Sequence, residues 1–288
     1  MPLVSEGAFI ASQHSPEGCR LVLLGAPLDA TVSFRPGSRF APAHIRQISE
    51  SLEEYSPTLA ADLGDIPFYD AGNINFAFGN VPAALATIHQ VVKSQVLDRG
   101  CRPLLLGGEH LVTLPAVAAV KARYPELVVV QFDAHADLRS HYLGEEQSHA
   151  TVMRRVCELV GAGNLYQFGI RSGTREEFIF GQENTHFFPY EVLMPLKQVL
   201  PQLVGRPVYV TVDIDVVDPA YAPGTGTPEP GGCSARELLL AIDMLANLNI
   251  VGFDLVEVCP PADHSDITAA LAAKVVRQAL LGMGRMAS

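Results

Sequence analysis

Short runs of apolar residues alternate along the chain with longer segments in which apolar and polar residues recur at helical spacing. The short runs, rich in Val, Leu and Ile, predict strands buried on both faces, whereas the longer segments predict helices. Strands are expected at Arg20–Gly25, Pro67–Ala71, Pro103–Gly107, Leu127–Asp133, Leu165–Ile170, His186–Phe188, Pro207–Asp213 and Ile250–Val256.

Helices are expected at Pro42–Glu54, Ala83–Leu97, Leu111–Tyr124, Thr151–Leu159, Glu191–Leu203, Ser234–Ala246 and Thr268–Leu280. This alternation of strands and helices predicts an α/β fold. We expect a three-layer αβα sandwich with a mostly parallel central sheet of about eight strands. Because no repeat, low-complexity tract or Pro/Gly/Ser-rich linker interrupts the pattern, residues 1–288 are expected to form a single domain.

The composition is that of a globular chain with a sizeable core, since 48% of the residues are hydrophobic and 18% are charged. A net charge of −11 argues against nucleic acid as a partner, because phosphates bind basic surfaces. The five cysteines are scattered and lack CxxC spacing, which predicts reduced thiols. No signal pattern and no membrane-length apolar stretch is found, so we expect a cytoplasmic protein with no membrane partner.

Two acidic clusters directly follow predicted strands. One contains Asp133, His135 and Asp137, and the other contains Asp213 and Asp215. On an extended backbone alternate residues point to one face, so the members of each cluster are expected to share a face. Four carboxylates gathered without cations would repel one another. We therefore expect divalent cations between them, and mixed carboxylate and imidazole ligands suit Mn²⁺, Fe²⁺, Co²⁺ or Zn²⁺.

Further polar residues are expected at the same edge of the sheet, beyond the strand ends where open α/β sheets bind ligands. His110 follows a strand and is either a ligand or a structural histidine, and Glu257 either meets a cationic substrate or pairs with a basic residue. His149 precedes a helix and is either a capping residue or a proton shuttle. The Gly/Pro-rich loop Ala220–Gly232 is typical of a pocket wall.

Three of these segments resemble the metal signatures of the ureohydrolase family, which includes arginase, agmatinase, formiminoglutamase and guanidinobutyrase. They are Gly107–His110, Asp133–Asp137, and Asp213–Pro219 with its continuation Pro223–Pro228. The resemblance covers nearly the whole chain, from Gly25–Pro27 and Arg35–Phe40 to Asp254–Pro260. Within the family, three segments are most similar to bacterial agmatinases: Asp137–Arg139, Phe168–Gly173 and Asp254–Val258.

The resemblance implies an arginase-like fold and two Mn²⁺ ions per chain, although Co²⁺, Fe²⁺ or Zn²⁺ would also suit oxygen and nitrogen ligands. It implies that one ion is held by His110, Asp133, Asp137 and Asp213, and the other by His135, Asp133, Asp213 and Asp215. It further implies that His149 acts in proton transfer, that Glu257 grips the guanidinium group, and that the protein is a homo-trimer or homo-hexamer.

The family reaction is hydrolysis of a guanidino group to urea and an amine. Resonance makes the guanidinium carbon a poor electrophile, and a pair of cations makes water a stronger nucleophile at neutral pH. Asp215 or His149 would carry the proton to the leaving amine. An excess of negative charge in the site suits the dication agmatine without excluding arginine. The resemblance to bacterial agmatinases implies putrescine and urea as products, in polyamine biosynthesis. Aminopropylagmatine, guanidinobutyrate, formiminoglutamate and arginine are the alternative substrates.

Two further residues are expected to contact the substrate. Arg139 stands where arginase-type members place an amide for the amino-acid head, and it would equally suit a carboxylate. Thr227 lies in the predicted wall segment. Departures from the family pattern are small: Glu109 stands where many members have Asp, and Ala136 and Ala150 replace residues that are often polar. A single-zinc deacetylase-like site is disfavoured because no His-His pair is present, and a non-enzymatic descendant is disfavoured because all six ligands are present.

Overall fold

The computed structural model describes residues 3–77 and 79–285. Its central sheet has nine strands within this part of the chain, in the order β1-β5-β2-β6-β11-β10-β7-β8-β9. Neighbouring strands are parallel except β1, which pairs antiparallel with β5. The strands are β1 (Leu3–Val4), β2 (Leu21–Ala26), β5 (Phe68–Ile74), β6 (Arg102–Gly107), β7 (Val128–Phe132), β8 (Leu165–Ile170), β9 (His186–Pro189), β10 (Val208–Asp213) and β11 (Ile250–Val256).

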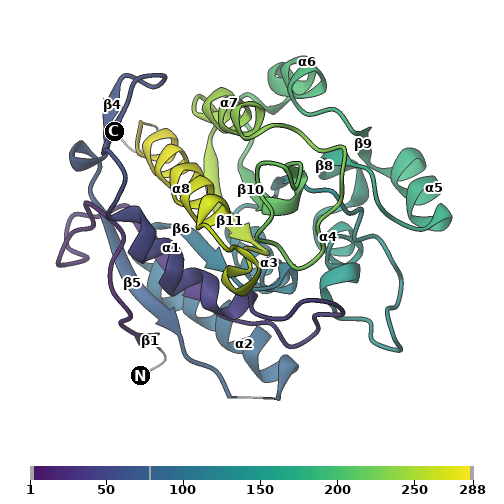
Figure 1. Ribbon diagram of the computed structural model, residues 1–288, viewed down its shortest axis with the longest axis horizontal. Coiled ribbons are helices and arrows are strands. Elements are labelled where there is room, and N and C mark those ends of the chain that lie inside the picture. The colour runs from purple at the N-terminus through teal and green to yellow at the C-terminus, as the bar shows by residue number, and fades with distance from the viewer. Residues whose placement is uncertain (1–2, 78, 286–288) are drawn as a thin grey trace.

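Helices cover both faces of this sheet, so the predicted three-layer αβα sandwich is confirmed (Figure 1). One layer contains α1 (Ala41–Ser49), α6 (Leu193–Leu203), α7 (Ala235–Leu245) and α8 (Ile267–Arg285). The other contains α2 (Val81–Val91), α3 (Thr113–Arg123) and α4 (Val152–Val160), while α5 (Arg175–Asn184) packs against β9. A π-helical turn covers Val92–Val96, and 3-10 turns cover Ser38–Phe40, Leu63–Asp65, Leu97–Arg99, His110–Val112, His149–Thr151, Ala162–Asn164, Ile214–Val216 and Pro260–Ala262.

The core is divided in two by the sheet, because successive side chains of each strand point to opposite faces. Leu23 and Leu104 pack into the cluster beneath α1, α7 and α8. Their neighbours Leu24 and Leu105 pack into the cluster beneath α2, α3 and α4. Full burial of one such side chain contributes about 1.5–3 kcal/mol. The two covered faces explain why the strands read as continuous apolar runs.

One predicted helix ends earlier than expected, and one helix of the structure was not predicted. The helix expected to reach Glu54 ends at Ser49, and the chain then forms the small hairpin β3 (Tyr55–Ser56) and β4 (Ala61–Asp62). Pro57 follows β3 inside this hairpin, and a residue before proline is disfavoured in helical conformation. Helix α5 was not predicted, although Thr174 and Glu177 form a capping box at its start, a pattern that the sequence carries.

Helix α8 is the one helix in the described part of the chain that is long and apolar enough to cross a membrane. Of its most apolar window, 78% is buried inside the protein. It packs against α1 and α7 and lies at the front of the view in Figure 1. The apolar surface of α8 therefore forms part of the protein core.

Candidate functional site

The predicted site residues meet at one edge of the sheet. The four adjacent strands β6, β11, β10 and β7 end there, and each is followed by one of the predicted polar segments. They surround a cavity of about 210 Å³. Its lining consists of Ser33, His110, His135, Asp137, Arg139, Tyr142, His149, Ala150, Ser172, Gly173, Glu177, Asp213, Thr227 and Glu257.

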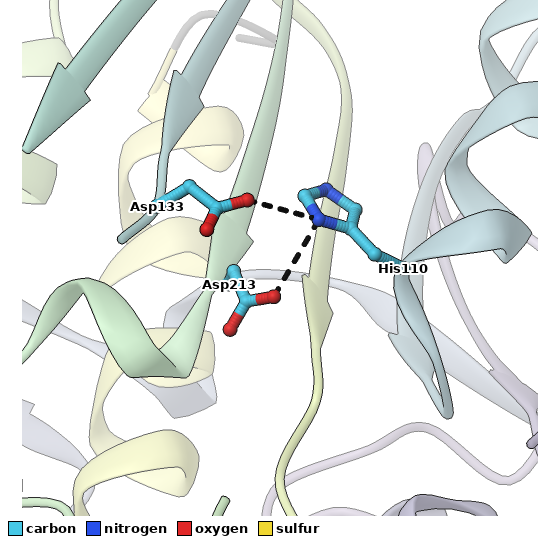
Figure 2. A group of neighbouring side chains, drawn as sticks. All are labelled: His110, Asp133 and Asp213. Carbon is cyan, nitrogen blue, oxygen red and sulfur yellow. Dashed lines mark ion pairs between the residues drawn. The ribbon is translucent and has the colours of Figure 1, made fainter. Parts of the chain in front are cut away.

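His110 is the centre of the first cluster, which Figure 2 shows in part. Its Nδ1 atom lies 3.1 Å from Asp133 Oδ2, 3.1 Å from Asp137 Oδ2 and 3.5 Å from Asp213 Oδ2. This nitrogen is buried and makes no hydrogen bond to any described residue. Its Nε2 atom lies 2.9 Å from the hydroxyl of Thr211, which fixes the ring.

This arrangement fits a bound cation. A buried nitrogen without a hydrogen bond faces carboxylate oxygens, while the opposite ring nitrogen is held by a polar neighbour, as in most metal-ligating histidines. Ligand atoms of His110, Asp133 and Asp213 lie within 4.8 Å of one another. The site could therefore hold a divalent metal ion.

A second group of ligand atoms, from Asp133, His135 and Asp215, also lies within 4.8 Å of one another. His135 Nδ1 is 2.9 Å from Asp215 Oδ2 and 3.8 Å from Asp133 Oδ1. The His135 side chain is 26% exposed, so this group opens toward the cavity. Asp133 faces the first group with Oδ2 and the second with Oδ1, and it is common to both.

The predicted geometry that brings these ligands together is wrong in one respect. The acidic residues do not continue an extended strand, because β7 ends at Phe132 and β10 ends at Asp213. Asp133 accepts a hydrogen bond from His135 N (2.6 Å), and Asp137 takes a left-handed conformation with φ of 53°. Asp213 caps a 3-10 turn by accepting from Asp215 N (2.9 Å). Tight turns, and not strand alternation, gather the carboxylates.

The electrostatics show how crowded the charges are. Burial, together with Asp215 and Asp137, raises the pKa of Asp133 to about 7. Burial also raises the pKa of Asp213 well above its ordinary value. Burial acts to lower the pKa of His135, but Asp215 and Asp133 outweigh it and raise that pKa to about 11. Added cations would stabilise the carboxylates in the charged form.

Glu257 stands beside this cluster with a backbone φ of 62°. Its Oε1 atom accepts a hydrogen bond from His110 N (2.7 Å), and burial raises its pKa to about 8. Its own N–H donates to Gly108 O (2.8 Å). A Cβ atom on Gly108 would lie 2.0 Å from Leu28 O, so only glycine fits where these loops meet. The second glycine of the sequence motif, Gly108, is thus explained by close backbone packing.

His149 lies across the cavity on a 3-10 turn. Its Nδ1 is 3.3 Å from Thr31 Oγ1 and its Nε2 is 3.4 Å from Ser33 Oγ. The ring packs edge-on against Tyr142 at a centroid distance of 5.5 Å. Burial lowers the pKa of His149, which favours the neutral ring at neutral pH.

Arg139 and Thr227 both line the cavity, but each already has a protein partner. Arg139 Nε lies 3.2 Å from Glu177 Oε2, and its guanidinium group stacks 4.9 Å from the centre of the Tyr142 ring. Thr227 Oγ1 donates to Asp215 Oδ2 (3.5 Å). Their contact with a substrate stays a prediction.

Three supporting residues were not predicted. Gln131 Nε2 donates to Asp133 Oδ2 (2.7 Å), and Thr211 holds His110. Both are polar residues within apolar strand runs, a signal that the sequence contained. Arg171 gave no such signal. It donates to the backbone carbonyls of Asp215, Val216, Glu229 and Pro230, and so fastens the loop that carries Asp215.

Comparison with known proteins identifies the family. The profile described as "Arginase family" matches residues 19–282. The chain belongs to this family. It is 52% identical over 277 residues to an agmatinase of Bacillus subtilis, with 95% of each chain covered. It is 38% identical over 278 residues to the N(1)-aminopropylagmatine ureohydrolase of Thermococcus kodakarensis, with 94% of this chain and 93% of the relative covered.

The fold agrees with solved structures of the same family. The crystal structure of agmatine ureohydrolase of Thermoplasma volcanium superposes with a TM-score of 0.88. The two chains are 34% identical, and the match covers 97% of this chain and 95% of the other. The predicted membership of the ureohydrolases and the predicted arginase-like fold are both confirmed.

Proposed function

We propose that this protein is an agmatinase that hydrolyses agmatine to putrescine and urea, a step of polyamine biosynthesis. The observation that carries the proposal is the pair of carboxylate–histidine groups that share Asp133 and open, with Glu257, into one cavity. The 52% identity to the Bacillus subtilis agmatinase supports agmatine among the guanidino compounds.

Two Mn²⁺ ions per chain are proposed for this site. His110, Asp133, Asp137 and Asp213 would hold one ion, and His135, Asp133, Asp213 and Asp215 would hold the other. The cavity lining contains no cysteine, and oxygen and nitrogen donors suit Mn²⁺, with Co²⁺, Fe²⁺ or Zn²⁺ as alternatives. When bound, the ions supply Lewis acidity that makes water a usable nucleophile at neutral pH.

The protein's own groups would bind the substrate and move protons. One oxygen of Glu257 is occupied by His110 N, which leaves the other to accept hydrogen bonds from a guanidinium N–H. Asp215 would accept a proton released from the attacking water. His149 faces the cavity as a neutral ring, and its Nε2 would take up a proton from solvent and then pass it to the leaving amine.

The pairing of Arg139 with Glu177 in the cavity lining supports agmatine over carboxylated substrates. Arg139 is the one arginine or lysine among the described lining residues, and Glu177 already pairs with it. A substrate carboxylate, as in arginine or guanidinobutyrate, would have to compete with Glu177 for this cation. Agmatine has no carboxylate and therefore does not have to displace Glu177 from Arg139. Single-domain organisation of residues 1–288, a trimeric or hexameric assembly, and a cytoplasmic location stay predictions.

A substrate panel tests the proposal. The purified protein is loaded with Mn²⁺, its metal content is measured, and urea release is followed with agmatine, aminopropylagmatine, guanidinobutyrate and arginine. We expect kcat/KM to be highest for agmatine. Asp133→Asn should abolish turnover and lower the metal content, because Asp133 is common to both groups. A preference for another compound, or unchanged turnover in the variant, would contradict the proposal.

A further inference from the structure

Thr31 and Glu109, two residues outside the predicted ligand and catalytic set, form a chain of contacts that ends on His149. Glu109 is fully buried, and its two carboxylate oxygens are both occupied by Thr31. Oε2 accepts from Thr31 N (2.7 Å), and Oε1 accepts from Thr31 Oγ1 (3.0 Å).

The backbone holds this contact in place. The segment after β2 and the segment after β6 are joined by Gly108 N donating to Ala26 O (2.9 Å) and Glu109 N donating to Leu28 O (2.6 Å). Their close approach depends on Gly108, whose missing side chain makes room for Leu28 O. These backbone hydrogen bonds therefore fix the position of the loop that contains Thr31.

The direction of the hydrogen bonds assigns a role to the histidine nitrogen. The hydroxyl of Thr31 gives its single proton to Glu109, so toward His149 it can only accept. It accepts from His149 N (3.1 Å) and lies 3.3 Å from His149 Nδ1. The proton of a neutral imidazole must then sit on Nδ1, which leaves the Nε2 lone pair on the side of Ser33.

We propose that Glu109 and Thr31 act together as a positioning clamp that selects the Nδ1–H tautomer of His149 and aims its Nε2 atom into the cavity. The clamp consists of Glu109 Oε1 and Oε2, Thr31 N and Oγ1, and His149 N and Nδ1. It rests on the proposed function, because it assigns His149 as the group that exchanges a proton at Nε2. Thr31 and Glu109 are positioning residues, since neither lines the cavity.

A double-mutant cycle tests the clamp through kinetics. Thr31→Val keeps the shape of the side chain but removes the hydroxyl. We expect kcat for the preferred substrate to fall about tenfold to hundredfold, with KM and metal content little changed. Thr31→Ser should restore most of the loss, because it returns the hydroxyl. In a His149→Ala background, Thr31→Val should change kcat by less than about twofold, since the clamp acts only through His149.

Two further variants keep the test decisive. Glu109→Gln preserves the shape but cannot accept from both donors of Thr31. It should therefore lower kcat as Thr31→Val does, and it should have little effect on kcat in the His149→Ala background. Thr87→Val is the control. It removes a hydroxyl that bonds Ala83 O on α2, away from the cavity, and should leave kcat unchanged. Equal losses with and without His149, or no loss in Thr31→Val, would overturn the clamp.

A spectroscopic measurement separates this inference from the proposed substrate. In ¹⁵N-histidine-labelled protein held in the diamagnetic Zn²⁺ form, long-range ¹H–¹⁵N correlations report which ring nitrogen carries the proton. The His149 signals are those missing from His149→Ala. We expect the Nδ1–H tautomer in the unmodified protein and its loss in Thr31→Val. An Nε2–H tautomer in the unmodified protein would refute the clamp, whereas failure to hydrolyse agmatine would refute only the substrate.

Discussion

Removing the hydroxyl that holds His110 should weaken metal binding without removing any ligand. Thr211→Val keeps the buried shape of the side chain but leaves His110 Nε2 without its partner at 2.9 Å. Loss of such a supporting contact costs about tenfold to hundredfold in metal affinity, or about 1.4–2.7 kcal/mol. The buried, unpaired nitrogen should also lower the free energy of unfolding of the metal-free protein by about 1–3 kcal/mol.

Calorimetric titration of metal-free protein with Mn²⁺ measures the first effect, and urea denaturation measures the second. Thr113→Val is a matched control, because Thr113 is buried beside Thr211 (3.4 Å between the hydroxyl oxygens) yet has no hydrogen bond to His110 among the described contacts. We expect the control to bind Mn²⁺ with nearly unchanged affinity. An affinity for Mn²⁺ within twofold of the unmodified protein in Thr211→Val, or an equal loss in Thr113→Val, would refute the reasoning.

Three other predictions concern the surroundings of the site. Arg171→Ala should lower the free energy of unfolding by about 2–4 kcal/mol, because several buried carbonyls lose their donor; thermal and urea denaturation will show this. Glu177→Gln should release Arg139, so the ratio of guanidinobutyrate to agmatine turnover should rise about two- to fivefold; an unchanged ratio in the urea assay would count against the pairing. Burial raises the pKa of Cys157 and Cys233 to about 12, so both thiols should stay protonated at pH 8 and react with a thiol reagent only after unfolding.

The strand ends that carry the site could be predicted because buried parallel strands have a recognisable pattern of residue types in the sequence. Each is a short Val/Leu/Ile run, and Asp, His or Glu stands at the end of each of the four central strands or within three residues after it. The carboxyl ends of parallel strands lie at one edge of the sheet, so the pattern predicted that His110, Asp133 and Asp213 share that edge. Their grouping as ligands came from the family resemblance. The geometry of the turns could not be predicted in this way, because the residue types around Asp137 do not indicate its left-handed conformation.

The supporting contacts depend on pairs of residues far apart in the chain. Thr31 and Glu109 are 78 positions apart, and Thr31 and His149 are 118 positions apart. No local periodicity relates such positions, since their contact depends on the strand order and on how closely two loops approach at Gly108. Arg171 is a similar case, because its role becomes visible only when the loop it fastens is folded around it.

The αβα architecture, the ligand residues to be considered and the resemblance to the ureohydrolases could all be predicted from the residues, because they depend on local composition and spacing. Folding set which oxygen faces which nitrogen. It paired Arg139 with Glu177 and left His110 Nδ1 facing carboxylates without a hydrogen bond from any residue that the structure describes. The physical reason is that apolar burial fixes the course of the backbone, whereas hydrogen bonds of about 3 Å depend on turns and loops that meet only after folding.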